Sequence, residues 1–194
     1  AVLQVTRPWG HLQLKGVVRD LDIQDGHFIS REYVGFGGGF SGNIKPDWFG
    51  WTKDNFVFQA EAGKGIGRYI NDSANAGLAT NYTGSPATLA TANSILFKPI
   101  AAFGANAGYQ HWWLPNVRST VSFGIEHDDI PSQLIGPVES TAANKELITT
   151  HANLIWSPVS FVDIGLEYLW GHRVVVANLK GDENVLISKF RIRF

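Results

Sequence analysis

The chain contains neither cysteine nor methionine. The lack of cysteine excludes a disulfide framework and a thiolate metal site. The lack of methionine means that the sequence does not begin at a translation start. Residues 1–7 already alternate like a strand and carry no signal-peptide pattern, so we expect either a mature fragment or only part of a chain.

Long apolar runs and charge are also scarce. No run approaches the roughly 18 apolar residues that a membrane-spanning helix needs, which argues against an inner-membrane protein. Charged residues make up 17% of the 194 residues, against about 25% in typical soluble proteins. The formal net charge of -1 gives no basic stripe, so no nucleic-acid partner is expected. Membrane β-barrels have this profile, because their lipid and water faces alternate and cancel in mean hydropathy.

What the sequence does contain is a period of two, clearest in residues 185–194 (VLISKFRIRF). Leu186, Phe190 and Ile192 share one face of this strand, whereas Lys189, Arg191 and Arg193 share the other. Outer-membrane barrels commonly end in an alternating strand closed by Phe, so this segment favours a barrel over a soluble sheet.

The same alternation recurs along the chain and predicts about nine strands. They cover residues 2–7, 11–19, 32–44, 55–62, 100–113, 117–128, 147–156, 161–170 and 185–194. We therefore predict an all-β protein, a transmembrane antiparallel β-barrel.

The expected connections differ in length between the two edges of the sheet. Short ones lie at residues 8–10, 45–53, 114–116 and 158–160, and longer polar ones at 24–30, 71–93, 129–145 and 171–184. Short turns on one edge and long loops on the other are typical of outer-membrane barrels, with the turns in the periplasm. Most of the tryptophans lie beside the short turns, as an aromatic belt at the membrane interface requires.

Several stretches of the chain resemble the DcaP-like porins of the bacterial outer membrane. They are HANLIWSPVSFVDIGLEYLWGHR (residues 151–173), VLISKFRIRF, WGHLQLKGVVRDL (9–21) and GKGIGRYI (63–70). The resemblance maps residues 1–194, as one barrel segment, onto the C-terminal half of a porin of about 16 strands. It implies a homotrimeric channel that is not an enzyme and that takes up small organic anions such as dicarboxylates. It also makes Phe194 the signal read by the outer-membrane assembly machinery.

Nine strands conflict with the even number of single-chain bacterial barrels, and an unpaired edge is not tolerated in lipid. Either more chain exists, or eight strands close a narrow barrel that serves as an anchor or adhesin. An outer-membrane hydrolase is a third interpretation, because His111, His127 and His151 are available. No GxSxG elbow supports it, and we assign no catalytic residue.

Two glycine-rich stretches, GFGGGF (35–40) and GKGIG (63–67), resemble phosphate-binding loops. Neither precedes a helical pattern, so we expect their glycines to make room in the lumen or to let strands bend. Among residues 126–129 (EHDD), only Glu126 and Asp128 converge on one strand face. A solvated strand end is favoured there over a loop-bound calcium, and no metal or cofactor is predicted.

The remaining polar residues on the water faces predict a pore wall with a modest basic surplus. The predicted pore-lining residues are Lys15, Arg19, Glu61, Arg118, Glu126, His151, Asp163, Glu167, Arg173, Lys189, Arg191 and Arg193. Pairing between neighbouring strands stabilises the wall, and the unpaired surplus sets selectivity. We therefore predict a passive channel for small hydrophilic solutes with a weak preference for anions. Its expected surroundings are the lipid bilayer and lipopolysaccharide of the outer membrane.

Overall fold

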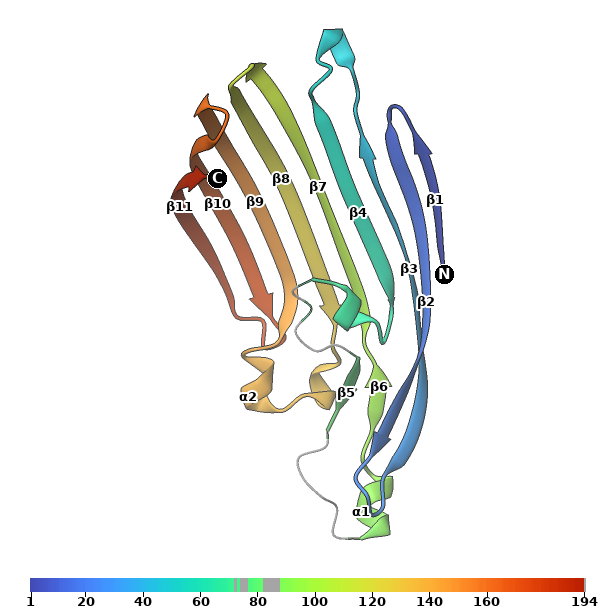
Figure 1. The fold of residues 1–194 in the computed structure, drawn as a ribbon. Coiled ribbons are helices and arrows are strands. Elements are labelled where there is room, and N and C mark those ends of the chain that lie inside the picture. The colour runs from blue at the N-terminus through green and yellow to red at the C-terminus, as the bar shows by residue number, and fades with distance from the viewer. Residues whose placement is uncertain (72, 74–76, 82–87, 194) are drawn as a thin grey trace.

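A computed structural model describes residues 1–71, 73, 77–81 and 88–193. It shows a curved, open antiparallel sheet in which each strand lies beside the next one along the chain (Figure 1). The nine strands are β1 (Val2–Arg7), β2 (Gly10–Gln24), β3 (Ser30–Ile44), β4 (Asn55–Lys64), β7 (Ala101–Leu114), β8 (Val117–Asp129), β9 (Asn144–Val159), β10 (Val162–Val175) and β11 (Lys180–Ile192). A separate two-stranded sheet, β5 (Leu78–Thr80) with β6 (Phe97–Pro99), lies in the connection between β4 and β7.

The nine predicted strands and the all-β architecture are confirmed. The predicted loop at residues 171–184 is wrong, because β10 and β11 continue through most of it and leave residues 176–179 as the connection. His172 pairs with Asp182 in the strand register, and the His172 Nδ1 lies 2.8 Å from an Asp182 carboxylate oxygen. Polar residues that look like a loop in the sequence thus pair with each other across the sheet.

The sheet does not close on itself. Its order begins with β1, which pairs with β2, and ends with β11, which pairs with β10. The alternative of a narrow, closed eight-stranded barrel is therefore wrong for this chain. Residues 2–7 are a paired strand, as the alternation predicts.

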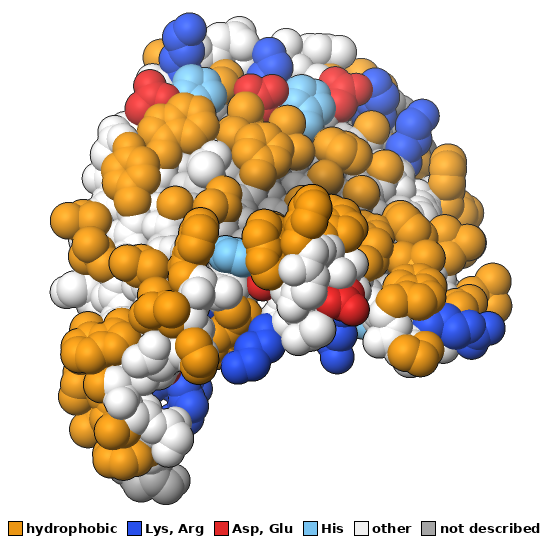
Figure 2. Space-filling view, turned by 90° about the horizontal axis from the view of Figure 1, so that it is seen from above, with side chains coloured by type: hydrophobic (Ala, Val, Ile, Leu, Met, Phe, Trp, Pro, Cys, Tyr) orange, Lys and Arg blue, Asp and Glu red, His pale blue; other side chains and the backbone are white. Residues whose placement is uncertain are grey.

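The two faces of the sheet differ in chemistry. On β10, Ile164, Leu166 and Tyr168 are exposed on the convex face, whereas Asp163 and Glu167 alternate with them on the concave face. Figure 2 shows hydrophobic side chains spread over the outside of the arc, and Lys and Arg side chains in its hollow. A row of His and charged side chains follows one rim of the convex face. An apolar outside and a polar inside match the two environments of a membrane barrel wall.

The helices are short and lie in the connections. They are the 3-10 helices η1 (Trp48–Gly50), η2 (Gly67–Tyr69) and η3 (Ser132–Leu134), and the α-helices α1 (Leu89–Asn93) and α2 (Pro137–Ser140). Among the described residues, no helix has the length and apolar character to cross a membrane.

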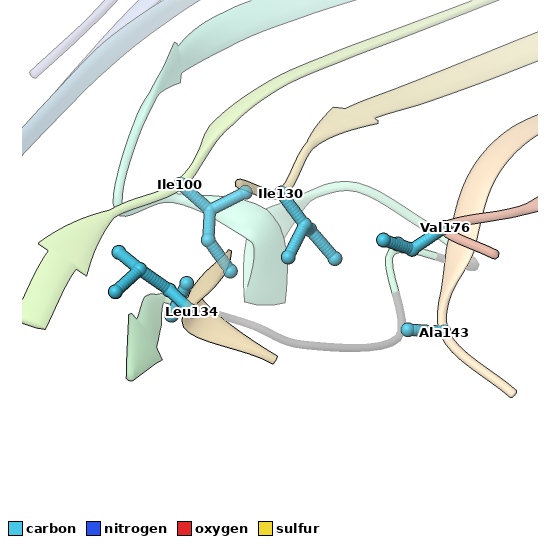
Figure 3. Close-up of a cluster of buried hydrophobic side chains, with 6 residues drawn as sticks. Ile100, Ile130, Leu134, Ala143 and Val176 are labelled. Carbon is cyan, nitrogen blue, oxygen red and sulfur yellow. The ribbon is translucent and has the colours of Figure 1, made fainter. Parts of the chain in front are cut away.

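At the long-loop end, a small hydrophobic core joins the connections. Ile100, Ile130, Leu134 and Val176 pack together with two alanines, Ala79 and Ala143 (Figure 3). The backbone N–H of Val176 also donates to the carbonyl of Ala143, at 3.1 Å. Connections that are far apart in the sequence therefore support one another at this end of the sheet.

Candidate functional site

The concave face carries the predicted pore-lining residues in register. In one row across the sheet, Arg118 of β8 pairs with Ile155 of β9, which pairs with Gly165 of β10, which pairs with Lys189 of β11. Strand pairing brings residues of one face side by side, so the side chains of such a row point to the same side. We call the inward-pointing positions of the nine strands the concave wall.

At the short-turn end of the concave wall, Asp163 joins two arginines. An Asp163 carboxylate oxygen lies 3.4 Å from the Arg118 guanidinium, and Arg193 donates a hydrogen bond to the same oxygen. The hydroxyl of Ser157 donates to the other oxygen, at 2.5 Å, and accepts from Arg118 at 3.0 Å. One buried carboxylate thus serves two cations, which leaves a local surplus of positive charge.

Farther along the wall, Glu167 of β10 lies beside two polar side chains of β9, His151 and Asn153. His151 Nδ1 lies 3.1 Å from one Glu167 oxygen, and the side-chain amide of Asn153 donates to the other at 3.4 Å. The sequence predicts His151 as a polar wall residue, and the structure gives it an acidic partner across the hairpin. In the described part of the chain, no hydrogen bond joins this imidazole to a serine hydroxyl.

Lys15 and Glu61 lie on strands that are separated by β3. Both pair with Gly39 in the register, and the Lys15 ammonium reaches a Glu61 oxygen at 3.5 Å. A β-carbon on Gly39 would lie 2.7 Å from the Cγ of Glu61. The glycine therefore leaves the space in which this pair meets above the sheet, as expected for glycines that make room in the lumen.

The other predicted residues lie apart from these pairs. Arg173, near the long-loop end, donates from Nε to the Asn144 side chain at 2.7 Å and also to the carbonyl of Ala142. Lys189 and Arg191 lie on the edge strand β11, and Arg191 pairs in register with Asp163. Phe194 lies outside the described residues.

Between β4 and β5 the chain folds inward over the concave wall, and we call residues 65–71 together with Ser73 the inner segment. It starts at Gly65, where φ is +68°, a conformation that favours glycine, and where the N–H donates to the carbonyl of Ile100 at 2.7 Å. The inner segment includes η2, which lies in front of the sheet near its middle in Figure 1.

Apolar side chains of the inner segment sit on glycines of the wall. Ile66 is 2% exposed and fills the space above Gly37 and Gly63, where β-carbons would lie 2.4 and 2.8 Å from its Cδ1 atom. Ile70, 6% exposed, packs with Ile66 and Ala102. Gly37 of the GFGGGF stretch and Gly63 of the GKGIG stretch thus form a seat for Ile66, which itself belongs to GKGIG.

The end of the inner segment is held by one buried carboxylate, that of Asp128, which lies near a second acidic residue. The Ser73 hydroxyl lies 2.9 and 2.8 Å from the two oxygens of Asp128, which is completely buried. Glu126, two residues earlier on the same face, is 4% exposed and lines a cavity of about 160 Å3 with Ile70, Asn71 and Thr149. The predicted pore-lining Glu126 therefore faces inward, but under the inner segment.

Two exposed residues of the inner segment were missed by the sequence reasoning. Arg68 and Tyr69 lie between the buried Ile66 and Ile70, and both are exposed. The predicted wall residue Arg19 holds this region, because its guanidinium lies 5.9 Å from the centre of the Tyr69 ring and donates to the carbonyl of Gly65 at 3.4 Å. The signal in the sequence was the apolar spacing of Ile66 and Ile70 within a stretch of polar residues.

A second cluster lies on the convex side, at the turn of residues 45–54. Asp54 is 1% exposed and accepts hydrogen bonds from the Tyr109 hydroxyl at 2.5 Å, from His111 Nδ1 at 2.6 Å and from the backbone N–H of Trp112 at 3.1 Å. Burial alone would raise the pKa of Asp54, but these hydrogen bonds outweigh it and hold the pKa below its ordinary value. The Trp51 ring packs on the edge of His111, 4.6 Å between centroids.

Neither the charged groups of the concave wall nor the Asp54 cluster offers a cation site. In the part of the chain that the structure describes, no three His, Cys, Asp or Glu side chains are grouped so as to hold a metal ion. The chemistry of the concave wall is instead that of fixed charges and hydrogen-bonding groups beside an open space.

Comparison with known proteins agrees with this architecture. The sequence model of the DcaP outer membrane protein family matches residues 97–192. The crystal structure of the outer membrane channel DcaP of Acinetobacter baumannii superposes with a TM-score of 0.68 at 19% sequence identity. The match covers 96% of this chain and 47% of that channel, so this chain spans about half of the channel's length. No curated protein matches the chain. The resemblance to the DcaP-like porins is confirmed, by the family model over residues 97–192 and by the fold that this chain shares with the outer membrane channel.

Proposed function

We propose that the chain forms about half of the wall of a passive channel that admits small hydrophilic solutes and favours organic anions such as dicarboxylates. The observation that carries the proposal is the division between an apolar convex face and a charged concave wall. No chemical step is proposed, because nothing in the wall requires one for solutes that move down their gradient.

The charge of the concave wall supports a preference for anions. Three of its acidic groups are paired: Asp163 with two arginines, Glu61 with Lys15, and Glu167 with His151. Lys189, Arg191 and Arg193 recur at every second residue, so their charges form a ladder with steps of about 7 Å. Low-dielectric walls focus the field of such a surplus into the pore.

The open edges β1 and β11 support the proposal that this chain supplies only about half of the wall. Unpaired N–H and C=O groups are not tolerated in lipid. We therefore propose that both edges pair with further strands of a larger barrel, in which this chain supplies the C-terminal half. Proposed partners are two further copies in a homotrimer, lipopolysaccharide around the convex face, and the assembly machinery through Phe194.

Reversal potentials of the intact protein in planar lipid bilayers test the proposal. Under a potassium chloride gradient we expect chloride to permeate better than potassium, more strongly at low ionic strength, where screening is weaker. The double variant Lys189→Gln, Arg191→Gln should lose most of this preference. Lys64→Gln, a matched loss of charge on the convex face, should not. A cation-selective wild-type pore would contradict the assignment.

A further inference from the structure

One part of the concave wall is polar without being charged. A row of paired residues runs across it from β1 to β7. We call the side chains of this row the amide band, and in strand order they are Gln4, Gln13, Ser41, Gln59 and Asn106. On the described strands β1–β8, neither this row nor the next concave row toward the short turns contains Lys, Arg, Asp or Glu.

Hydrogen bonds across the strands order the amide band. The Gln13 side-chain amide donates to the Gln4 side-chain oxygen at 3.2 Å, and the Ser41 hydroxyl donates to the Gln13 oxygen at 3.4 Å. Gln4 and Asn106 are exposed, and the other three residues of the band are half-buried. A side-chain amide both donates and accepts, so these contacts leave further hydrogen-bonding capacity for groups in the hollow. Solute hydroxyls can therefore take the place of water on the band.

The amide band and the cations of β11 lie in different parts of the arc. β1 and β11 form the two ends of the curved sheet (Figure 1), and the hollow lies between them (Figure 2). Lys189 and Arg191 belong to β11, whereas the band begins on β1. Lys15, in the row beyond the band, is paired with Glu61. A solute in the hollow thus meets cations on one side and neutral hydrogen-bonding groups on the other.

We propose that the channel favours hydroxylated carboxylates, the chemistry of sugar acids. Their hydroxyl groups bond to the amide band while a carboxylate faces the cations of β11. This inference rests on the proposed anion channel and names the class of anion that it favours. A hydroxyl group donates and accepts, as an amide does, whereas an ammonium or guanidinium group only donates. Exchange of water for amide partners is nearly balanced, so binding stays weak enough for release, as conduction requires.

Two dicarboxylates with the same carbon chain test this inference, because glucarate carries hydroxyl groups where adipate carries hydrogen. Equal concentrations of their potassium salts are placed on the two sides of a planar bilayer that contains the intact protein. The reversal potential then gives the ratio of the glucarate permeability to the adipate permeability. Glucarate is larger and diffuses more slowly, so a wall without hydroxyl contacts gives a ratio below one. We expect a ratio of about two, the gain from one weak net hydrogen bond.

Substitutions in the amide band locate the effect. The double variant Gln13→Met, Gln59→Met keeps the length of both side chains and removes their amides. Its glucarate-to-adipate ratio should fall below one, while its chloride-to-potassium permeability ratio stays at the wild-type value. The matched control is Gln24→Met, at an exposed position beside Asp22 near the long-loop end, which should keep both wild-type ratios.

Loss of the β11 cations separates charge from hydroxyl recognition. The double variant Lys189→Gln, Arg191→Gln should lose anion preference and keep a glucarate-to-adipate ratio above one. A wild-type protein that forms no channel, or one that selects cations, would defeat the proposed function itself. An anion-selective channel with a glucarate-to-adipate ratio at or below one would overturn this inference alone. Equal ratios in the methionine double variant and in Gln24→Met would also overturn it.

Discussion

Gly104 lies directly beneath Ile70, and a β-carbon on Gly104 would come within 2.6 Å of the Ile70 Cγ2 atom. The next nearest atom outside Ile70 is the Ile125 carbonyl oxygen, at 4.0 Å. An added methyl group would therefore collide with the inner segment and leave the strand itself undisturbed. Because Ile70 is β-branched, it cannot rotate freely out of the way.

We accordingly expect Gly104→Ala to lift the inner segment from the wall. Folded, detergent-solubilised protein should then be cleaved by trypsin after Arg68 several times faster than wild type, because cleavage tracks local opening. Fragment masses identify the site. Gly165→Ala is the matched control, because its β-carbon would meet its nearest neighbour at an ordinary 3.6 Å. Equal cleavage in both variants would show that the glycine seat does not hold the segment.

The second prediction concerns the charge that Asp163 neutralises. Asp163→Asn should leave Arg118 and Arg193 without their shared carboxylate and increase the preference of the channel for anions. Reversal potentials under a salt gradient measure the change. Asp182→Asn removes the same charge at a convex position beside His172 and should have no such effect. A shift toward cations in Asp163→Asn would mean that the two arginines do not act on permeating ions.

The third prediction concerns the alternating faces of β10. Single cysteines at residues 164–168 should react in alternation with a membrane-impermeant thiol reagent in reconstituted protein. Positions 165 and 167 should be labelled and positions 164, 166 and 168 protected by lipid, because successive side chains point to opposite faces. Labelling at every position would contradict the assignment of the convex face to lipid.

The fourth prediction concerns Asp54 and pH. Asp54→Asn places an amide where the carboxylate accepts hydrogen bonds from Tyr109 and His111. We expect a cost of about 1–3 kcal/mol in the free energy of unfolding at neutral pH, typical of a buried group left without its partner. Urea unfolding of refolded protein in micelles measures it. Asp47→Asn, at an exposed position of the same turn, is the control.

The sign of the pH dependence follows from the lowered pKa of Asp54. A carboxyl whose pKa is lower in the folded state stabilises the protein fully above its ordinary value, 3.8 for Asp54. That contribution is lost as the pH falls through the folded-state pKa. The difference between wild type and Asp54→Asn should therefore be largest at neutral pH and shrink below pH 3.8. A difference that grows on acidification would contradict the ionised state of Asp54.

The sequence predicted the wall well because each strand separates two environments. In residues 185–194, Phe190 must face lipid and Lys189 must face water. The period of two is therefore strong, and the sequence predicts this strand. The alternation does not extend to His172 and Asp182, because both are polar residues on the convex side near the rim. The sequence therefore predicted a loop where the two strands continue. The inner segment has no strand period, and the contact of Ile66 with Gly37 joins positions that only the folded sheet brings together.

The strand order also bears on how the chain folds. Each pairing within β1–β4 and within β7–β11 joins consecutive strands, so these two meanders form from local contacts with little loss of chain entropy. The pairing of β4 with β7 must instead close a connection of residues 65–100. The inner segment reaches from Gly37 and Gly63 on one meander to Asp128 on the other. We expect the inner segment to pack last and to prevent the two meanders from separating between β4 and β7.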